Sequence, residues 1–214
     1  MESMPPGLDI DAKIWRTLLE IEQRAPSWVI PNKAFEHRYG RLPDEIEIRA
    51  WSIPRASGLF LYSLVRILRP TRILEVGTSF AYSTLWLSAA APRGTKVHTI
   101  ELLPEKLEIA REHLESAGVS NVKLHAREAL EVTAEWKKSL DFTFFDADPE
   151  NYITYFNSLA PHFTSNALLV MDNALNHANE TNPFIEFMIQ QKKWRSWIHP
   201  LDHGFLIAVR NGDA

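Results

Sequence analysis

The sequence predicts a doubly wound, mostly parallel α/β sheet of seven strands with extra helices at its N-terminal end. Three observations lead to this fold class. From Pro70 onward, strand-like and helix-like segments alternate with short connections, as in parallel sheets with right-handed crossovers. The segments Leu140–Phe145 and Ala167–Met171 are almost wholly apolar, which is typical of strands buried on both faces. The 214 residues, 45% of them hydrophobic, suit a single α/β domain.

The region before Pro70 differs from the rest of the chain. Its spacing predicts an amphipathic helix at Ile10–Arg24, an irregular stretch at Ala25–Pro43 and a helix at Ala56–Leu68. We interpret residues 1–52 as an N-terminal helical extension and residues 53–214 as the core of one domain covering 1–214. The extension could pack on the sheet, form a dimer surface or act as a lid over a substrate.

The first half of the core alternates regularly between strands and helices. Gly77 closes the first strand, a Pro-Arg-Gly turn at 92–94 stops the next helix, and Pro104 stands at a tolerated first-turn position. We expect strands at Thr71–Val76, Lys96–Glu101 and Asn121–His125, and helices at Phe80–Ala91, Pro104–Gly118 and Glu128–Trp136.

The second half adds the two apolar strands and a terminal hairpin. We expect a helix at Tyr152–His162 between the apolar strands and another at Asn182–Lys193, with Leu175–Asn182 as a candidate lid loop. The segments Ser196–His199 and Gly204–Arg210 read as two strands around a turn. A hairpin cannot be wholly parallel, so the sheet should be mixed at one edge.

Composition excludes several classes of protein. There is no cysteine, which rules out disulfides, thiolate nucleophiles and zinc–thiolate sites. The 23 Lys and Arg residues against 27 Asp and Glu give a formal net charge of −4, so we expect no nucleic-acid partner. No apolar run of about 18 residues and no secretory signal is present, so we expect no membrane partner and a cytoplasmic location.

Ligands of open doubly wound sheets bind beyond the carboxyl ends of the strands. Gly77 ends the first strand just ahead of a helix, where a ligand can approach the backbone. Glu101 closes the second strand, and an acid there can accept hydrogen bonds from both ribose hydroxyls of a nucleoside. The turn after Gly77 lacks the G-x-G-x-x-G pattern that cradles a pyrophosphate. This favours a nucleoside cofactor without a diphosphate and argues against a dehydrogenase.

Two acids stand at the carboxyl ends of the apolar strands. If these strands are neighbours in the sheet, Asp146 and Asp172 lie side by side, and such a pair either raises one pKa or recruits a cation. Asn173 adds a neutral oxygen, which completes a donor set suited to Mg²⁺ or Ca²⁺. The alternative is that each Asp only caps the following turn.

An ordered series of motifs resembles the metal-dependent O-methyltransferases typified by catechol and caffeoyl-CoA O-methyltransferases and their bacterial relatives. The similarity runs from about Ile53 to Arg210. Its motifs are Ser52–Gly58, Ile73–Thr78 with Tyr82–Thr84, Ile100–Glu101, Phe145–Asp148 with Asn151–Tyr152, and Met171–Asn173. The resemblance implies a Rossmann-like S-adenosylmethionine-dependent methyltransferase that acts on a hydroxyl of a small aromatic or vicinal-diol acceptor, with 53–214 as its catalytic core. It also implies a homodimer.

The resemblance assigns roles to individual residues. Three sets would contact the methionine part, the ribose and the adenine of S-adenosylmethionine: Glu75, Gly77 and Ser83; then Glu101; then Glu128 and Ala129. Thr78, Asp146 and Asp148 complete the implied cofactor-binding set. Asp146, Asp172 and Asn173 resemble the family's metal ligands.

Three departures from the family pattern bear on the mechanism. Ala81 replaces a usual glycine, and Arg127-Glu128 replaces a usual glycine-acid pair. Pro149 stands where the family has its general-base lysine, and proline can neither accept nor donate a proton. A bound divalent cation could lower the pKa of the acceptor hydroxyl, with solvent or His177 taking the proton.

Without the lysine, two further interpretations stay open. The protein could be a metal-independent methyltransferase that acts on an amine or an acidic phenol. It could instead bind S-adenosylmethionine as a catalytically weak interaction protein.

Overall fold

The structure is a computed structural model that describes residues 3–25 and 52–212. Within this part of the chain, seven strands form one sheet in the order β3-β2-β1-β4-β5-β7-β6. They are β1 Arg72–Val76, β2 Lys96–Glu101, β3 Val122–Ala126, β4 Leu140–Phe145, β5 Phe163–Met171, β6 Trp194–His199 and β7 Phe205–Arg210. Strands β1 to β5 are parallel, and β7 runs antiparallel to both β5 and β6. The predicted fold class is confirmed, including the mixed edge.

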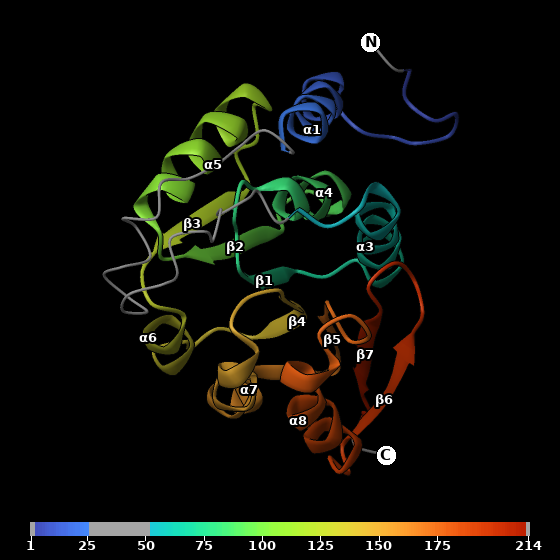
Figure 1. The fold of residues 1–214 in the computed structure, drawn as a ribbon, viewed down its shortest axis with the longest axis vertical. Helices are drawn as coiled ribbons and strands as arrows, with labels where there is room; N and C mark the ends of the chain where they lie inside the picture. Colours follow the sequence, from blue (N-terminus) through green and yellow to red (C-terminus); the bar gives the residue numbers. More distant parts are fainter. Residues whose placement is uncertain (1–2, 26–51, 213–214) are drawn as a thin grey trace.

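Helices cover both faces of the sheet (Figure 1). One layer holds α3 Arg55–Leu68, α4 Tyr82–Ala90 and α5 Pro104–Ser116, with α1 Ala12–Arg24 packed outside α4 and α5. The other layer holds α6 Ala129–Ala134, α7 Tyr152–Leu159 and α8 Ala178–Ile189. Two short 3₁₀ helices, η2 Pro149–Asn151 and η3 Ala160–His162, flank α7. None of the helices in the described ranges is long and apolar enough to cross a bilayer.

Alternating side chains of the strands divide the core into two clusters. On β1, Ile73 packs in the cluster under α3 and α4, while Leu74 packs in the cluster under α7 and α8. On β4, Phe144 and Phe145 divide in the same way. Since successive side chains of a strand point to opposite faces, a strand covered on both faces has mostly apolar side chains along its length. This explains the largely apolar runs in the sequence.

The strand order creates a switch point between β1 and β4. The chain proceeds outward from β1 to β2 and β3, and then returns to place β4 and β5 on the other side of β1. The carboxyl ends of β1 and β4 therefore meet where the connections leave in opposite directions. This is the edge of the sheet at which a ligand is expected.

Several predicted helices have different ends in the structure, and two of these differences lie near the carboxyl ends of β4 and β5 or in the predicted lid. Helix α8 begins at Ala178, ahead of the predicted Asn182, and it carries Pro183 inside its second turn. Most of the predicted lid loop 175–182 is therefore helical. The helix predicted at Tyr152–His162 is α-helical only to Leu159 and ends in η3. Most of the predicted irregular stretch Ala25–Pro43 lies outside the described residues, and the division at residue 52 stays a prediction.

Candidate active site

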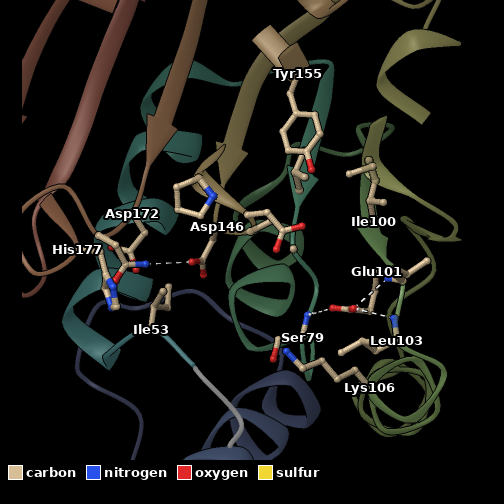
Figure 2. A pocket seen from close by; sticks show the side chains of 18 of the residues that line it. Ile53, Ser79, Ile100, Glu101, Leu103, Lys106, Asp146, Tyr155, Asp172 and His177 are labelled. Atoms are coloured by element: carbon tan, nitrogen blue, oxygen red, sulfur yellow. Dashed lines mark hydrogen bonds between the residues drawn. The ribbon is translucent and has the colours of Figure 1, made fainter. Parts of the chain in front are cut away.

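A cavity of about 580 Å³ opens at the carboxyl ends of the parallel strands. Its wall includes the residues that follow β1, β2, β4 and β5, together with Ile53 ahead of α3. Figure 2 shows two sides of this cavity, with Glu101 and Lys106 on one side and Asp172 and His177 on the other. Asp146 projects between them from the end of β4. The arrangement follows from the switch point, because five separate segments end there.

The loop between β1 and α4 forms the floor of the cavity. Gly77 has a φ of 102°, and the backbone at Ser79 and Ala81 is also left-handed. A Cβ at position 77 would lie 2.0 Å from the carbonyl oxygen of Asp146. Glycine is thus required because the loop packs directly on the backbone that follows β4. Ala81, with a φ of 65°, holds the same backbone region without the freedom of the family's glycine.

Glu101 accepts hydrogen bonds from three backbone amides and so ties the loop after β1 to the segment after β2. Its Oε2 accepts a hydrogen bond from the Ser79 amide at 2.9 Å, and its Oε1 accepts from the amides of Leu102 and Leu103 at 2.9 and 3.0 Å. A carboxylate offers about four lone-pair positions, so capacity remains for a ligand hydroxyl. Glu101 is therefore fixed in orientation before any ligand arrives (Figure 2).

Three predicted cofactor residues lie behind the loop instead of in the cavity wall. Glu75, Thr78 and Ser83 are buried and do not line the cavity. Glu75 Oε2 accepts hydrogen bonds from the hydroxyls of Thr84 and Thr99 at 2.5 and 2.6 Å, while its Oε1 has no partner among the described residues. Complete burial is the main cause that raises the pKa of Glu75 to about 7.

At the outer end of the cavity, Arg127 and Ala129 contribute to the wall and Glu128 does not. Glu128 is the residue that precedes α6, and its side chain makes no capping hydrogen bond there. Arg127 forms ion pairs with Glu131 of α6 at 3.1 Å and with Glu135, the residue after α6, at 2.8 Å. The predicted adenine end is therefore bordered by a paired guanidinium instead of by Glu128.

The two acids after β4 and β5 lie side by side, as predicted. Phe145 pairs with Met171 in the sheet, so Asp146 and Asp172 leave neighbouring strands at the same level. Burial is the main cause that raises both pKa values, and the charge of Asp172 raises the pKa of Asp146 further. The side-chain amide of Asn173 donates to Asp146 Oδ1 at 3.4 Å (Figure 2). The alternative in which each Asp only caps a turn does not explain this convergence.

The donor chemistry of this trio fits a hard divalent cation. Two adjacent carboxylates, one buried and one partly buried, disfavour their shared ionised state, and a cation between them would remove that cost. Rotation of the Asn173 amide by 180° would present its oxygen in place of its nitrogen. No group of three or more His, Cys, Asp or Glu side chains in the described residues is arranged as a metal site, so the third protein ligand would be the amide.

The residues predicted around proton transfer lie at one side of the same cavity. Pro149 begins η2, and both it and Asp148 line the wall. His177 precedes α8 at the mouth, where its Nδ1 lies 3.6 Å from Glu180 Oε2 and its side chain is half-exposed. Pro149 thus occupies the wall without any group that could exchange a proton.

Sequence reasoning missed three polar residues in the cavity wall: Lys106, Tyr155 and His203. Lys106 is a buried cation in the first turn of α5, and its charge lowers the pKa of Asp146. A cation at that end of a helix opposes the helix dipole, which is a signal the sequence offered. His203 lies in the β6–β7 turn, and its distance along the chain from the other site residues gave no signal.

The fold and the cavity define a class I methyltransferase, and comparisons with known proteins identify the family. A family model described as O-methyltransferase matches residues 43–192. The chain therefore belongs to the O-methyltransferase family. The resemblance, the fold class and the enzyme class inferred from the sequence, an S-adenosylmethionine-dependent methyltransferase, are confirmed.

Individual relatives agree with this assignment. A catechol O-methyltransferase from Niastella koreensis is 28% identical over 152 residues, which cover 66% of this chain and 69% of the relative. A catechol O-methyltransferase from Mycobacterium tuberculosis is 31% identical over 134 residues, which cover 62% and 61%. A Bacillus cereus O-methyltransferase solved in complex with SAH has a TM-score of 0.74 and 25% identity, covering 92% of this chain and 91% of that one.

Proposed function

We propose that the protein transfers the methyl group of S-adenosylmethionine to one of two adjacent hydroxyls of a small acceptor, with a divalent cation held by Asp146, Asp172 and Asn173. The observation that carries this proposal is the convergence of one buried and one partly buried carboxylate and an amide in the cavity that also contains Gly77 and Glu101. The names of the catechol and caffeoyl-CoA O-methyltransferases support a hydroxyl acceptor.

The donor side of the reaction is supported by the SAH-bound relative and by two features of this chain. Glu101 is held by three backbone amides and can accept from ribose hydroxyls. Glu75 lies behind the loop, and its buried Oε1, which has no partner among the described residues, would have to turn toward the cavity to meet the ammonium of the methionine part. S-adenosylmethionine, when bound here, would supply the methyl group from its sulfonium to the acceptor oxygen and would leave as S-adenosylhomocysteine.

The acceptor side would use the opposite wall of the cavity. Asp146, Asp172 and Asn173 would hold Mg²⁺ or Ca²⁺, which lowers the pKa of an acceptor hydroxyl and orients the diol. His177, at the mouth, would take the released proton, or water would take it. The cavity would align the acceptor oxygen with the methyl group, and such alignment contributes on the order of 7 kcal/mol in favourable systems.

A second candidate function is a metal-independent methyltransferase that acts on an amine or an acidic phenol. Two observations favour it: Pro149 provides no base, and the Asn173 nitrogen faces Asp146 Oδ1. An acceptor that is already nucleophilic would need neither a cation nor a base. The homodimer and the cytoplasmic location expected from the sequence stay predictions.

The first experiment is a calorimetric titration of S-adenosylmethionine into the purified protein, with Mg²⁺ and then with EDTA, followed by methylation assays on vicinal diphenols and on amines. We expect cofactor binding and Mg²⁺-dependent O-methylation. Turnover that EDTA leaves unchanged would select the metal-independent function. Binding without turnover on any acceptor would select the interaction protein, and no binding would contradict the proposal.

Asp172→Asn tests the cation site. We expect it to lower kcat by roughly 100-fold or more while S-adenosylmethionine affinity changes little, because the variant removes a charged ligand on the acceptor side. Asp11→Asn is the matched control, since Asp11 caps α1 far from the cavity and Asn caps helices equally well. Equal activity of both variants would contradict a cation at Asp172.

A further inference from the structure

The loop that carries Asp146 and Asp148 contacts an unusual partner beneath it. The phenol oxygen of Tyr152 accepts a hydrogen bond from the Ala147 amide at 2.9 Å and donates one to the Ala147 carbonyl at 3.0 Å. One hydroxyl thus binds both polar groups of a single residue. Because Ala147 stands between the two acids, its two peptide groups set the direction of both side chains.

Packing fixes the phenol itself. Tyr152 is 1% exposed, with its ring stacked on Phe145 at 5.2 Å and edge-on to Phe184 at 5.6 Å. It occupies the first position of α7, so its backbone is also part of a regular element. The hydroxyl therefore has little freedom to leave Ala147.

The loop is held on its other side by the floor of the cavity. The Asp146 amide donates to the Val76 carbonyl at 2.9 Å, and the Asp146 carbonyl leaves no room for a Cβ at Gly77. Beyond Ala147, the Asn151 amide donates to the Asp148 carbonyl at 3.1 Å and closes η2. In this segment, the two polar groups of Ala147 are satisfied by a side chain instead of by the backbone.

We propose that Tyr152 is a positioning residue of the active site, whose hydroxyl holds the Ala147 peptide groups and thereby fixes Asp146 for cation binding and methyl transfer. This inference rests on the proposed function for its catalytic readout. Tyr152 lies beneath the loop and does not line the cavity. It would therefore contact neither the cation nor the acceptor, and its effect would pass through Asp146. Removal of the hydroxyl leaves the Ala147 N–H and C=O without their partner and allows the loop to turn.

The test compares Tyr152→Phe with Tyr62→Phe. Tyr62 is a matched control because its buried hydroxyl also donates to a backbone carbonyl, that of Asp9 at 2.9 Å, but outside the cavity wall. For Tyr152→Phe we expect kcat for a vicinal diphenol to fall roughly 10- to 100-fold and Mn²⁺ affinity, measured by electron paramagnetic resonance of free Mn²⁺, to fall by a similar factor. For Tyr62→Phe we expect both values to stay within about twofold of the wild type.

A merely structural role would lower the melting temperature of both variants and leave kcat and Mn²⁺ affinity of the folded protein unchanged, which would overturn the proposal. If the wild type shows no methylation, the proposed function fails, and hydrogen exchange at the Ala147 amide decides the positioning role by itself. We expect this amide to exchange slowly in the wild type and roughly tenfold or more faster in Tyr152→Phe. Fast exchange in the wild type would overturn the inference even if the variant does not fold.

Discussion

Gly77 lies where the loop after β1 contacts the loop after β4. Its φ of 102° and the 2.0 Å distance from a built Cβ to the Asp146 carbonyl oxygen both oppose any side chain. We expect Gly77→Ala to lower the free energy of unfolding by more than about 3 kcal/mol, since backbone strain and a clash with rigid backbone act together. Urea denaturation measures this loss.

Gly94→Ala separates the two causes. Gly94 has a similar φ of 91°, but a Cβ there would have nothing within 4 Å. Strain alone should cost about 1 kcal/mol. If Gly77→Ala is no more destabilising than Gly94→Ala, the contact with Asp146 is not what requires glycine at position 77.

At this scale, the sequence predicted which residues reach the site more reliably than which way they face. Asp146 and Asp172 converge because strand pairing is readable from two apolar runs. Glu75 also lies near the carboxyl end of a parallel strand, yet its carboxylate points toward Thr84 and Thr99 behind the loop. That choice depends on hydrogen-bond partners from α4 and β2, which no local pattern encodes.

At the scale of elements, α3 and α4 are joined through a glycine in helix α3. A Cβ on Gly58 would lie 2.3 Å from Trp86 Nε1, and the indole is fully buried. Helix propensity alone would make Gly58→Ala stabilising by about 1 kcal/mol. We expect the opposite, a net loss of about 2 kcal/mol, because overpacking against a rigid ring outweighs propensity. Thermal or urea unfolding measures the sign directly.

Two comparisons identify the contact as the cause. Ser63→Ala, at an exposed position on the same helix, should show the small gain that propensity predicts. In a double-mutant cycle, Trp86→Leu should recover part of the loss in the Gly58→Ala background. A stabilised Gly58→Ala, or strictly additive losses, would show that the α3–α4 contact is not tight at this point.

Two strands with clear local patterns were predicted to the residue, while the ends of several other elements were not. Strands β2 and β4 begin and end where alternation and the apolar run predicted. Helix α8 begins four residues before the predicted Asn182, and Pro183 lies inside the helix. The cost of the missing hydrogen bond is offset by burial of Phe184 and Met188, which is a tertiary effect.

At the scale of the whole molecule, the site depends on where the terminal hairpin attaches. Strand β7 pairs with β5, and this brings the β6–β7 turn to the residues after Asn173: the Ala174 amide donates to the Gly204 carbonyl at 2.9 Å. The sequence predicted a mixed edge but could not select the position of the hairpin. The expectation that ligands bind beyond the carboxyl ends of parallel strands therefore identified the residues after those strands. It did not identify His203, which lies in the turn of the hairpin.

The stability of the whole molecule contains two contributions that respond to pH in opposite directions. Glu75, with its pKa raised from 4.5 to about 7, binds its proton more readily when folded, so its contribution to stability grows as pH falls from 7 to 4.5. His98 is buried against His125, and its pKa is lowered from 6.5 to about 4, mainly by burial. Its contribution is present above pH 6.5 and is lost as pH falls toward 4.

These two slopes have opposite signs over the window from pH 6.5 to 4.5, and single variants should separate them. In Glu75→Gln, the free energy of unfolding should fall more steeply on acidification than in the wild type, because a compensating contribution of up to about 3 kcal/mol is missing. In His98→Gln, the free energy of unfolding should instead rise relative to the wild type on acidification.

Urea denaturation at half-unit steps from pH 7.5 to 4.5, without cofactor, measures the three profiles. Other shifted groups add their own slopes: the raised pKa values of Asp146 and Asp172 act with Glu75, and the lowered pKa values of His113 and His125 act with His98. Since the charge of Glu75 contributes to the raised pKa of Asp146, Glu75→Gln also removes that contribution, which has the same sign. Only the difference from the wild type is therefore diagnostic. Parallel profiles for Glu75→Gln and the wild type would mean that Glu75 does not hold its proton in the folded state.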